Sequence, residues 1–280
     1  MTPSPGGLTL RFWGVRGSIP TPSLENLRYG GNTACVEIRS ADAILIFDLG
    51  TGARKLGEDL IAEHQGRPIT LHVFLTHYHW DHLQGLPLFG PLYNPANNIT
   101  FHGPAQLGSI EEHLRGQMAA PYFPVDFNQV PTQMKFTETG TETITIGDIR
   151  VDSFPMNHPQ GAFGYRVRSA AGTIIYASDR EHGNADSDRI LREVAKDADV
   201  LIYDAQYTPD DYPAHKGWGH GTWFEGAKVA HDSNVNQLIL FHHDPAHDDL
   251  KMDRIEEDAR RHFPNTLAAR EGLAIQLPRG

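Results

Sequence analysis

Histidine and aspartate side chains gather in one short segment, THYHWDH at residues 76–82, which directly follows an apolar run. Within six residues it contains three imidazoles, His77, His79 and His82, and the carboxylate of Asp81. Imidazole nitrogen and carboxylate oxygen are ligands that suit zinc, manganese or iron. A polar loop with scattered histidines does not account for this density of potential ligands. The segment therefore predicts a metal site built on a loop that follows a strand.

Three further candidate ligands each follow a predicted strand. His158 comes after one in the sequence MNHPQG, Asp179 ends one in YASD, and His242 follows the apolar run LILF. Considered singly, such a histidine is often a polar loop residue, and Asp179 could be a helix cap. Their common position at strand ends favours a ligand role. His243 and His247 stay open, either as neighbours of the site or as surface residues.

The segment at residues 77–82 resembles the His-x-His-x-Asp-His signature of the metallo-β-lactamase superfamily, and the resemblance extends through most of the chain. It implies a four-layer αββα sandwich of the α/β (α+β) class with two divalent metal ions, Zn²⁺ or Mn²⁺ with iron as a further option. One ion would be held by His77, His79 and His158, the other by Asp81, His82 and His242, with Asp179 bridging them. The activity implied is hydrolysis by a dinuclear-metal hydroxide.

Two further stretches resemble the ribonuclease Z and cyclic phosphodiesterase branch of this superfamily. They are GWGHGT at residues 217–222 and DVLIYDAQY at residues 199–207. The resemblance implies that His220 protonates the leaving oxygen and that Asp204 orients the His220 ring. Asp81 could accept the proton of the nucleophile. An imidazole that is held by a carboxylate suits the role of proton donor. The alternative makes His220 a mere helix-start residue, and Gly221 stands where the branch commonly has serine.

The size of the substrate is predicted from charge and spacing. The formal net charge is −11, with 24 Lys and Arg against 35 Asp and Glu, and RNA binding relies on cationic side chains. Between His158 and Asp179 there is too little chain for the long basic arm by which ribonuclease Z enzymes hold tRNA. The segments RFWGVRGSIP and YGGNT resemble bacterial proteins near the phosphoribosyl cyclic phosphodiesterase. We therefore expect a small phosphodiester, such as a cyclic nucleotide or cyclic sugar phosphate, and no large nucleic acid.

Three alternatives remain open at this stage. The first is a ribonuclease Z-like endoribonuclease or 3′-end nuclease, and the second is a thioester or lactone hydrolase on the same metals. The third is a metal-binding sensor without activity, which the complete set of candidate ligands disfavours.

The elements that must position these residues are predicted from hydrophobic periodicity. Strands are expected at 8–13, 34–38, 43–47, 69–75, 143–146, 149–155, 164–169, 173–177, 200–203 and 237–241. Helices are expected at 56–64, 109–118, 186–196 and 222–231. Strands with intervening helices favour two packed sheets with helices outside, which we interpret as one domain over residues 1–280.

Composition sets further bounds. Cys35 is the single cysteine among 280 residues, so an internal disulfide framework and a cysteine-rich zinc site are excluded. An 18-residue apolar run and a signal-peptide pattern are both absent, so we expect a cytoplasmic protein without membrane contact. Homodimers are common among soluble proteins, although no segment of this sequence indicates an interface.

Several residues could shape a pocket or serve only the fold. The Gly-rich loops with Arg16, Ser18 and Asn32 could hold phosphate or form turns. Tyr122 and Phe123, between two prolines, could stack on a substrate or anchor a loop. The role of His215 is open.

Overall fold

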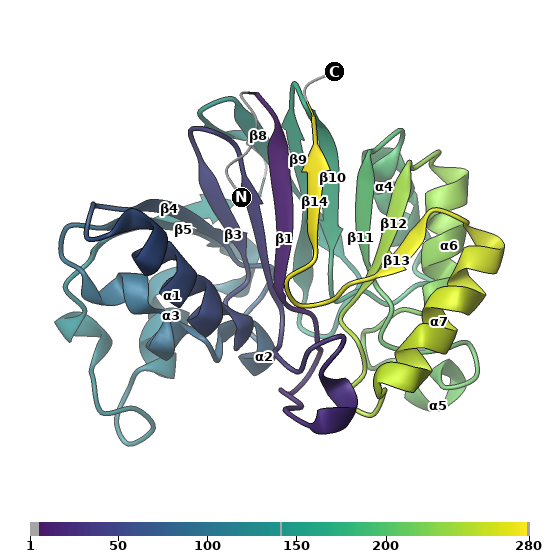
Figure 1. Ribbon diagram of the computed structural model, residues 1–280, viewed down its shortest axis with the longest axis horizontal. Coiled ribbons are helices and arrows are strands. Elements are labelled where there is room, and N and C mark those ends of the chain that lie inside the picture. Colours follow the sequence, from purple (N-terminus) through teal and green to yellow (C-terminus); the bar gives the residue numbers. More distant parts are fainter. Residues whose placement is uncertain (1–5, 141, 279–280) are drawn as a thin grey trace.

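A computed structural model describes residues 6–140 and 142–278 of the chain. Two sheets of seven strands each lie face to face (Figure 1). From edge to edge, the first sheet contains β14 (Ala274–Leu277), β1 (Leu8–Gly14), β2 (Cys35–Arg39), β3 (Ile44–Phe47), β4 (Thr70–Phe74), β5 (Asn98–Pro104) and β6 (Gln133–Thr139). The second contains β13 (Thr266–Ala268), β12 (Gln237–Phe241), β11 (Val200–Asp204), β10 (Gly172–Ala177), β9 (Ala162–Ser169), β8 (Ile149–Met156) and β7 (Ile144–Ile146).

The two sheets have matching topologies. In the first, β14, β1, β2 and β3 are antiparallel neighbours, and β3 to β6 are parallel. In the second, β7 to β10 are antiparallel, and β10 to β13 are parallel. Each half of the chain thus forms an antiparallel part and then a parallel part, as two pseudo-equivalent halves require.

Helices cover the outer face of each sheet (Figure 1). The helices are α1 (Gly52–His64), α2 (Trp80–Leu83), α3 (Ile110–Gln117), α4 (Ala185–Ala195), α5 (Tyr212–His215), α6 (Trp223–Asp232) and α7 (Asp249–His262). Short 3₁₀ turns lie at Leu24–Asn26, Leu86–Leu88, Gly90–Tyr93, Ala105–Leu107 and Phe127–Gln129. Helices α1 and α3 pack on the first sheet, and α4, α6 and α7 pack on the second. This confirms the predicted αββα sandwich.

Three apolar clusters separate the four layers. One fills the space between the sheets and includes Phe12, Phe47 and Tyr176. A second lies between the first sheet and its helices, and a third between the second sheet and α4, α6 and α7. Burial of these faces is the main driving force for the layered arrangement. None of the helices described here has the length and apolarity needed to cross a bilayer.

Most predicted elements are found, with shifts of a residue or two at their ends. Helix α1 begins at Gly52, four residues before the predicted start. Its first turn has no large apolar side chain to mark it, and Gly52 packs against β1, where a Cβ would come within 2.5 Å of the Trp13 backbone. The sequence pattern does not predict strands β5, β6, β13 and β14 or helices α2, α5 and α7. Strand β6 has only two apolar residues, Met134 and Phe136, and α7 is rich in charge, so neither shows a strong apolar pattern.

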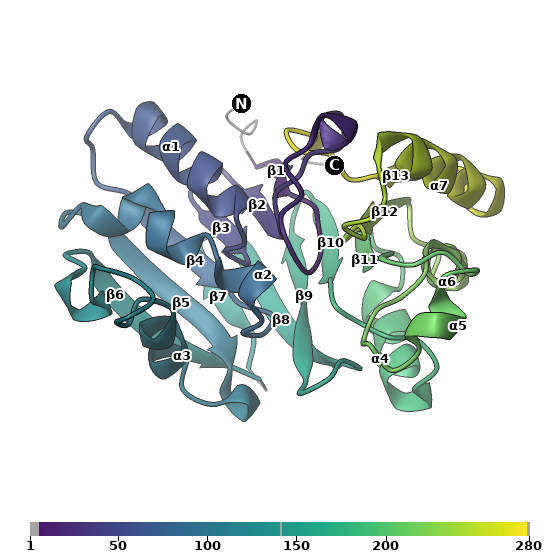
Figure 2. The same ribbon diagram turned by 90° about the horizontal axis from the view of Figure 1, so that it is seen from below.

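The topology brings six strand ends to one edge of the sandwich. The carboxyl ends of β3, β4, β8, β10, β11 and β12 all lead into the loops at this edge, where α2 also lies (Figure 2). Parallel strands end at the same edge of their sheet, so residues distant in sequence meet there. Every predicted site residue follows one of these strands or belongs to a loop at the same edge.

Candidate metal centre

Four of the predicted ligands form a buried group at the strand-end edge: Asp81, His82, Asp179 and His242. Their ligand atoms all lie within 4.8 Å of one another. His82 Nε2 is 3.1 Å and His242 Nε2 is 3.2 Å from Asp179 Oδ1, and His242 Nε2 is 3.2 Å from Asp81 Oδ2. Asp81 and His82 lie in the short helix α2 rather than in an irregular loop. Two carboxylates and two imidazoles therefore point at a common centre.

Residues behind this buried group orient its ligands. His82 Nδ1 lies 2.9 Å from Asp48 Oδ2, and His242 Nδ1 lies 3.0 Å from Gln206 Oε1, so in both rings Nδ1–H donates and Nε2 faces inward. The backbone N–H of Ser18 donates to Asp81 Oδ2 over 2.7 Å. Such outer contacts fix the tautomer and direction of metal-binding histidines.

The other three predicted ligands, His77, His79 and His158, form a second group that lies closer to solvent. His79 Nδ1 is 3.2 Å from His158 Nε2. The outer nitrogens face neutral partners: His79 Nε2 contacts Gln160 Oε1 over 2.9 Å, and His158 Nδ1 contacts the Gly219 carbonyl over 2.9 Å. We call this the open group and the first one the buried group.

Asp179 lies between the two groups. Its Oδ1 faces His82 and His242, while its Oδ2 lies 3.8 Å from His77 Nε2 and 3.9 Å from His158 Nε2. One carboxylate thus presents an oxygen to each group, as a ligand bridging two cations requires.

The residues present fit a pair of divalent cations. The nitrogen His77 Nε2 is buried and has no hydrogen-bond partner, although buried polar atoms are normally paired. Nitrogen and oxygen donors in groups of three and four suit zinc or manganese. The donor sets therefore match what two cations need.

Three residues of this centre adopt left-handed backbone conformations. The φ angles are 61° at Asp48, 57° at Asp179 and 61° at His242. Each of them follows the end of a strand, where the chain must turn so that the side chain points inward. Such conformations are uncommon outside glycine and concentrate at functional sites.

The electrostatics of the two groups differ. Burial works to lower the pKa of both His77 and His82. For His77 the neighbouring imidazoles add to this effect, and its pKa lies well below the usual value. For His82 the carboxylates of Asp179, Asp81 and Asp48 outweigh burial and raise the pKa well above that value. The buried group thus has the more negative potential.

His220 and Asp204 lie beside both groups. His220 Nδ1 is 2.8 Å from Asp204 Oδ2, and the ring stacks on that of His242 with 4.9 Å between centroids. Asp204 is in turn fixed by the backbone N–H groups of Arg180 and Gln206. The structure therefore brings together the predicted imidazole and the predicted carboxylate.

The charge of His220 depends on these neighbours. Burial alone lowers its pKa, but the carboxylate of Asp204 and its hydrogen bond raise the pKa to about 9. Dications at the adjacent ligand groups would oppose this rise, because they repel an imidazolium. The Asp204 contact thus favours the protonated form of His220, which a proton donor needs.

A cavity of about 420 Å³ opens over the centre, lined by Ser18, Tyr78, His79, Trp80, Asp81, Asp179 and His220. Trp80 is 72% exposed at its mouth. The cavity thus joins the open group, the bridging carboxylate and the candidate proton donor in one space.

Comparison with known proteins agrees with this geometry. Residues 46–243 match the family model described as "Beta-lactamase superfamily domain". The chain belongs to this superfamily. The match spans most of the chain and contains every proposed ligand.

The similar proteins of the superfamily include a ribonuclease Z from Lachnospira eligens, 26% identical, with 94% of this chain and 96% of the relative aligned. Among solved structures, the metallo-β-lactamase fold protein YhfI from Bacillus subtilis has a TM-score of 0.75 at 19% identity, over 97% of this chain and 99% of its own. A diphosphatase from the PhnP family has a TM-score of 0.68 at 18% identity, over 96% and 97% of the two chains. The ribonuclease Z relative bears out the resemblance to the ribonuclease Z branch of the superfamily.

The structure also shows the contacts of several residues whose roles the sequence leaves open. Arg16 is fully buried and donates to the backbone carbonyls of Gly30, Asp244 and His247, so it holds loops together. Ser18 lines the cavity, as the phosphate-loop prediction requires.

Asn32 donates to Glu271, which supports the turn-forming interpretation. Tyr122 is 85% exposed and is not among the residues that line the cavity, whereas Phe123 packs on the core beneath α3. His243 is buried, contacts the Ala269 carbonyl over 2.8 Å and belongs to neither ligand group. His215 stacks on Tyr207.

Sequence reasoning missed four residues near the centre: Asp48, Gln160, Glu181 and Gln206. Asp48 ends a buried strand, as the proposed ligands do, and that signal could have singled it out. Gln160 and Glu181 lie close in sequence to His158 and Asp179, but their contacts are with residues far along the chain. Spacing alone offers no signal for them.

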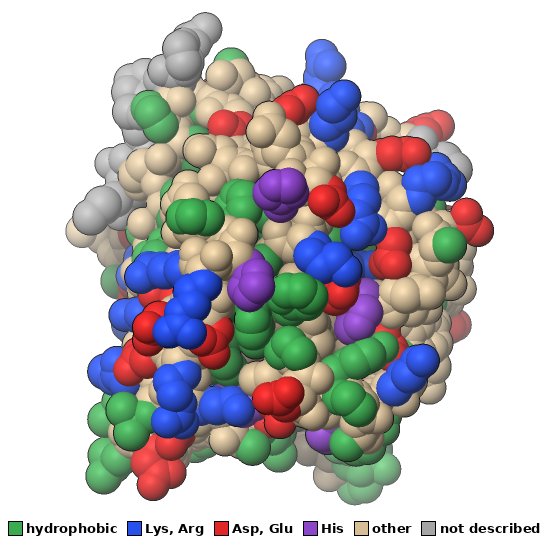
Figure 3. Space-filling view, turned by 90° about the vertical axis from the view of Figure 1, so that its right-hand side faces the viewer, with side chains coloured by type: hydrophobic (Ala, Val, Ile, Leu, Met, Phe, Trp, Pro, Cys, Tyr) green, Lys and Arg blue, Asp and Glu red, His purple; other side chains and the backbone are tan. Residues whose placement is uncertain are grey.

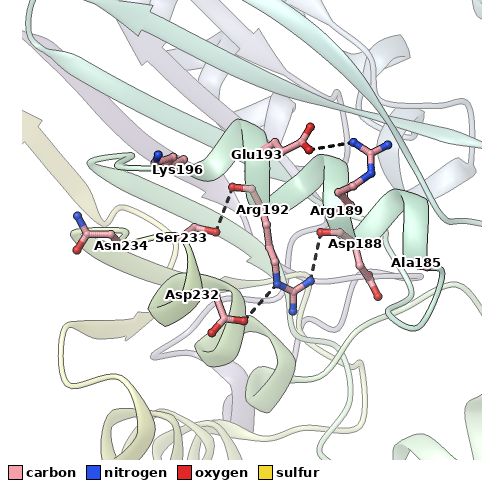
Figure 4. Close-up of a pocket in the computed structure, with 9 residues that line it drawn as sticks. All are labelled: Ala185, Asp188, Arg189, Arg192, Glu193, Lys196, Asp232, Ser233 and Asn234. Atoms are coloured by element: carbon pink, nitrogen blue, oxygen red, sulfur yellow. Dashed lines mark hydrogen bonds and ion pairs between the residues drawn. The ribbon is translucent and has the colours of Figure 1, made fainter.

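A second hollow lies between α4 and α6 on the outer face of the sandwich (Figure 4). It measures about 480 Å³ and is lined by Ala185, Asp188, Arg189, Arg192, Glu193, Lys196, Asp232, Ser233 and Asn234. Its charged side chains pair with one another, as Arg189 does with Glu193 and Arg192 with Asp232. It contains none of the predicted site residues and is separate from the candidate centre.

Proposed function

We propose that this protein is a metal-dependent hydrolase of phosphate diesters. The observation that carries the proposal is His220, held by Asp204 at 2.8 Å beside two ligand groups that share Asp179. Cleavage of a diester leaves an alkoxide that needs a proton, and an oriented imidazole can supply one.

Each side chain has a proposed task. The open group would hold one cation and the buried group the other, with Asp179 bridging. Such a pair of cations polarises the phosphate and lowers the pKa of water between them. His220 would protonate the leaving oxygen. The pKa of Asp81 is lowered, since His82 and His242 outweigh the effect of burial, so its ligand task is better supported than proton acceptance.

Features of this chain favour a small substrate. The cavity of about 420 Å³ suits a compact molecule. The alignment with the L. eligens ribonuclease Z runs over 321 positions although this chain has 280 residues, so that relative has stretches without a counterpart here. On the face seen in Figure 3, cationic and anionic side chains are interspersed. Ion pairs such as Lys228–Glu225 on α6 and Arg261–Glu257 on α7 neutralise each other. A continuous basic track for RNA is not formed on this face.

The curated relatives favour the other candidate, a ribonuclease Z-like nuclease. The L. eligens ribonuclease Z aligns over nearly the whole of both chains, and this similarity supports RNA as the substrate more directly than it supports a cyclic phosphate. A gel shift with precursor tRNA at two salt concentrations separates the candidates. Tight, salt-sensitive binding followed by 3′-end cleavage would replace the small-substrate proposal.

The class of reaction is tested by turnover of three chromogenic substrates: bis(p-nitrophenyl) phosphate, p-nitrophenyl acetate and a cephalosporin. The protein is stripped of metal and reloaded separately with zinc and with manganese. We expect metal to restore cleavage of the diester above all. Restored activity on the ester or the lactam alone would leave the metal centre intact as a proposal and contradict the task of His220.

A further inference from the structure

The carboxylate of Glu181 is buried next to the proposed centre but belongs to neither ligand group. It lies two residues after Asp179 and is only 7% exposed. Burying a charged group is costly unless partners compensate it. The identity of those partners therefore indicates what the residue does.

All three donors that reach the Glu181 carboxylate come from one stretch of chain, Tyr212 to Gly219. The Tyr212 hydroxyl donates to Oε1 over 2.8 Å and the Gly217 N–H donates to the same oxygen over 2.7 Å. The Gly219 N–H donates to Oε2 over 3.0 Å. Both oxygens are thus used to hold the loop that leads into His220.

The main chain of Glu181 is tied to the other side of the centre. Its N–H donates to the Asn157 carbonyl over 2.7 Å, and the Asn157 side-chain amide donates back to the Glu181 carbonyl over 3.0 Å. Asn157 directly precedes His158, a member of the open group. One residue therefore connects the segments that carry Asp179, His158 and His220.

The loop held by Glu181 contacts the open group directly. The Gly219 carbonyl lies 2.9 Å from His158 Nδ1, and a Cβ at Gly219 would come within 2.4 Å of the same nitrogen. At Gly219 the φ angle is +91°, a conformation that favours glycine. A rotation of the Gly217–His220 backbone would therefore displace both the partner of His158 and the ring of His220.

We infer that Glu181 is a positioning residue that fixes the Gly217–His220 loop, and with it the place of His220 and the tautomer of His158. The inference rests on the proposed function. A carboxylate suits this task because it accepts with both oxygens. Glutamine has nearly the same shape, but its NH2 group would face one of these three N–H or O–H groups, and two donors cannot form a hydrogen bond.

The experiment compares Glu181→Gln with His220→Ala and with two controls. Glu193→Gln alters an exposed carboxylate on α4 that pairs with Arg189. Tyr212→Phe removes one donor and leaves both backbone donors in place. In the metal-loaded proteins we measure kcat and KM on two diesters, bis(p-nitrophenyl) phosphate and diphenyl phosphate, together with bound metal and the amide exchange of residues 216–220. Diphenyl phosphate has the more basic leaving group and depends more on proton donation.

Glu181→Gln should lower kcat on diphenyl phosphate by about 10-fold to 100-fold, within the range of general acid catalysis. The loss on bis(p-nitrophenyl) phosphate should be much smaller, as for His220→Ala, with KM unchanged. Both ions should stay bound in the metal-loaded protein, although the open group should hold its ion more weakly, because His158 loses the partner that fixes its tautomer. Amide exchange at Gly217 and Gly219 should become at least about tenfold faster. Tyr212→Phe should cause only a small part of these changes, and Glu193→Gln none.

Equal losses on the two diesters, or unchanged amide exchange in Glu181→Gln, would overturn the inference. A loss that follows a lowered melting temperature equally in all loops would also overturn it, because the role would then be structural. If the wild-type protein cleaves neither diester, the proposed function fails. The amide exchange still tests in that case whether Glu181 holds the loop.

Discussion

The buried group and the open group use similar side chains in different surroundings. The buried group combines two carboxylates with two imidazoles, and a further carboxylate, Asp48, lies directly behind His82. The open group consists of three imidazoles whose outer partners are the neutral Thr76, Gln160 and Gly219. Apart from the shared Asp179, the negative charge is thus concentrated on one side.

The two proposed cations should therefore not be equivalent. Coulombic attraction grows as charges are buried, so the buried group should bind a dication more tightly. The open group is neutral and closer to solvent, so its cation should exchange faster. This gives a ranking in which the buried group binds its cation more tightly than the open group does.

Removing the shared ligand should affect both groups. In Asp179→Asn an amide nitrogen replaces one of the two oxygens that face His82 and His77, and the negative charge is lost, so binding of both cations should weaken. The loss of activity should exceed the roughly 100-fold upper range found for changes outside the ligand set. Metal analysis after dialysis checks this, and retention of two tightly bound ions would contradict the bridging task.

Variants that each remove one histidine, from one group or the other, should each lose a different cation. His82→Ala should lose the buried cation and also lower the free energy of unfolding by about 1–3 kcal/mol, because Asp48 loses a buried partner. His79→Ala should lose only the open cation and keep its stability. The check is metal content per chain together with thermal unfolding. The ranking is wrong if His79→Ala loses both ions while His82→Ala keeps one.

Changing the carboxylate behind His82 should have a moderate effect. Asp48→Asn keeps the shape but removes the charge that faces His82 Nδ1, so affinity at the buried group should fall by about 10-fold to 100-fold. Affinity at the open group should stay the same. Competition with a chelating dye measures both, and an equal fall in both affinities would show that Asp48 is not specific to the buried group.

The smallest effect is expected at the exposed partner of the open group. Gln160→Ala removes the contact with His79 Nε2, but solvent can replace it. The affinity of the open group should therefore fall by less than the roughly tenfold lower range of such changes. The same dye competition applies, and a larger loss than in Asp48→Asn would reverse the ranking.

The ligand groups could be anticipated because their residues share a recognisable position. His77 to His82 form a dense motif, and His158, Asp179 and His242 each follow an apolar strand, so an edge common to these strands brings them together. The central strands were equally visible, since buried strands such as β11 are continuous apolar runs.

The remaining features depend on contacts that sequence does not encode locally. Asp48, behind His82, and Glu181, behind His220, act on residues tens of positions away. Helix α7 hides its buried Met252, Ile255 and Ala259 among charged residues. The division into a buried and an open group follows from packing, because His77 and His82 belong to one motif and yet face different neighbours.

Stepwise reloading of the metal-stripped protein with zinc tests most directly whether activity needs two cations that bind with different affinity. Bound ions per chain and turnover of bis(p-nitrophenyl) phosphate are followed in the same samples. We expect two binding steps of different affinity, with little turnover after the first ion and full turnover only after the second. Full turnover with one ion per chain, or turnover without metal, would contradict this expectation.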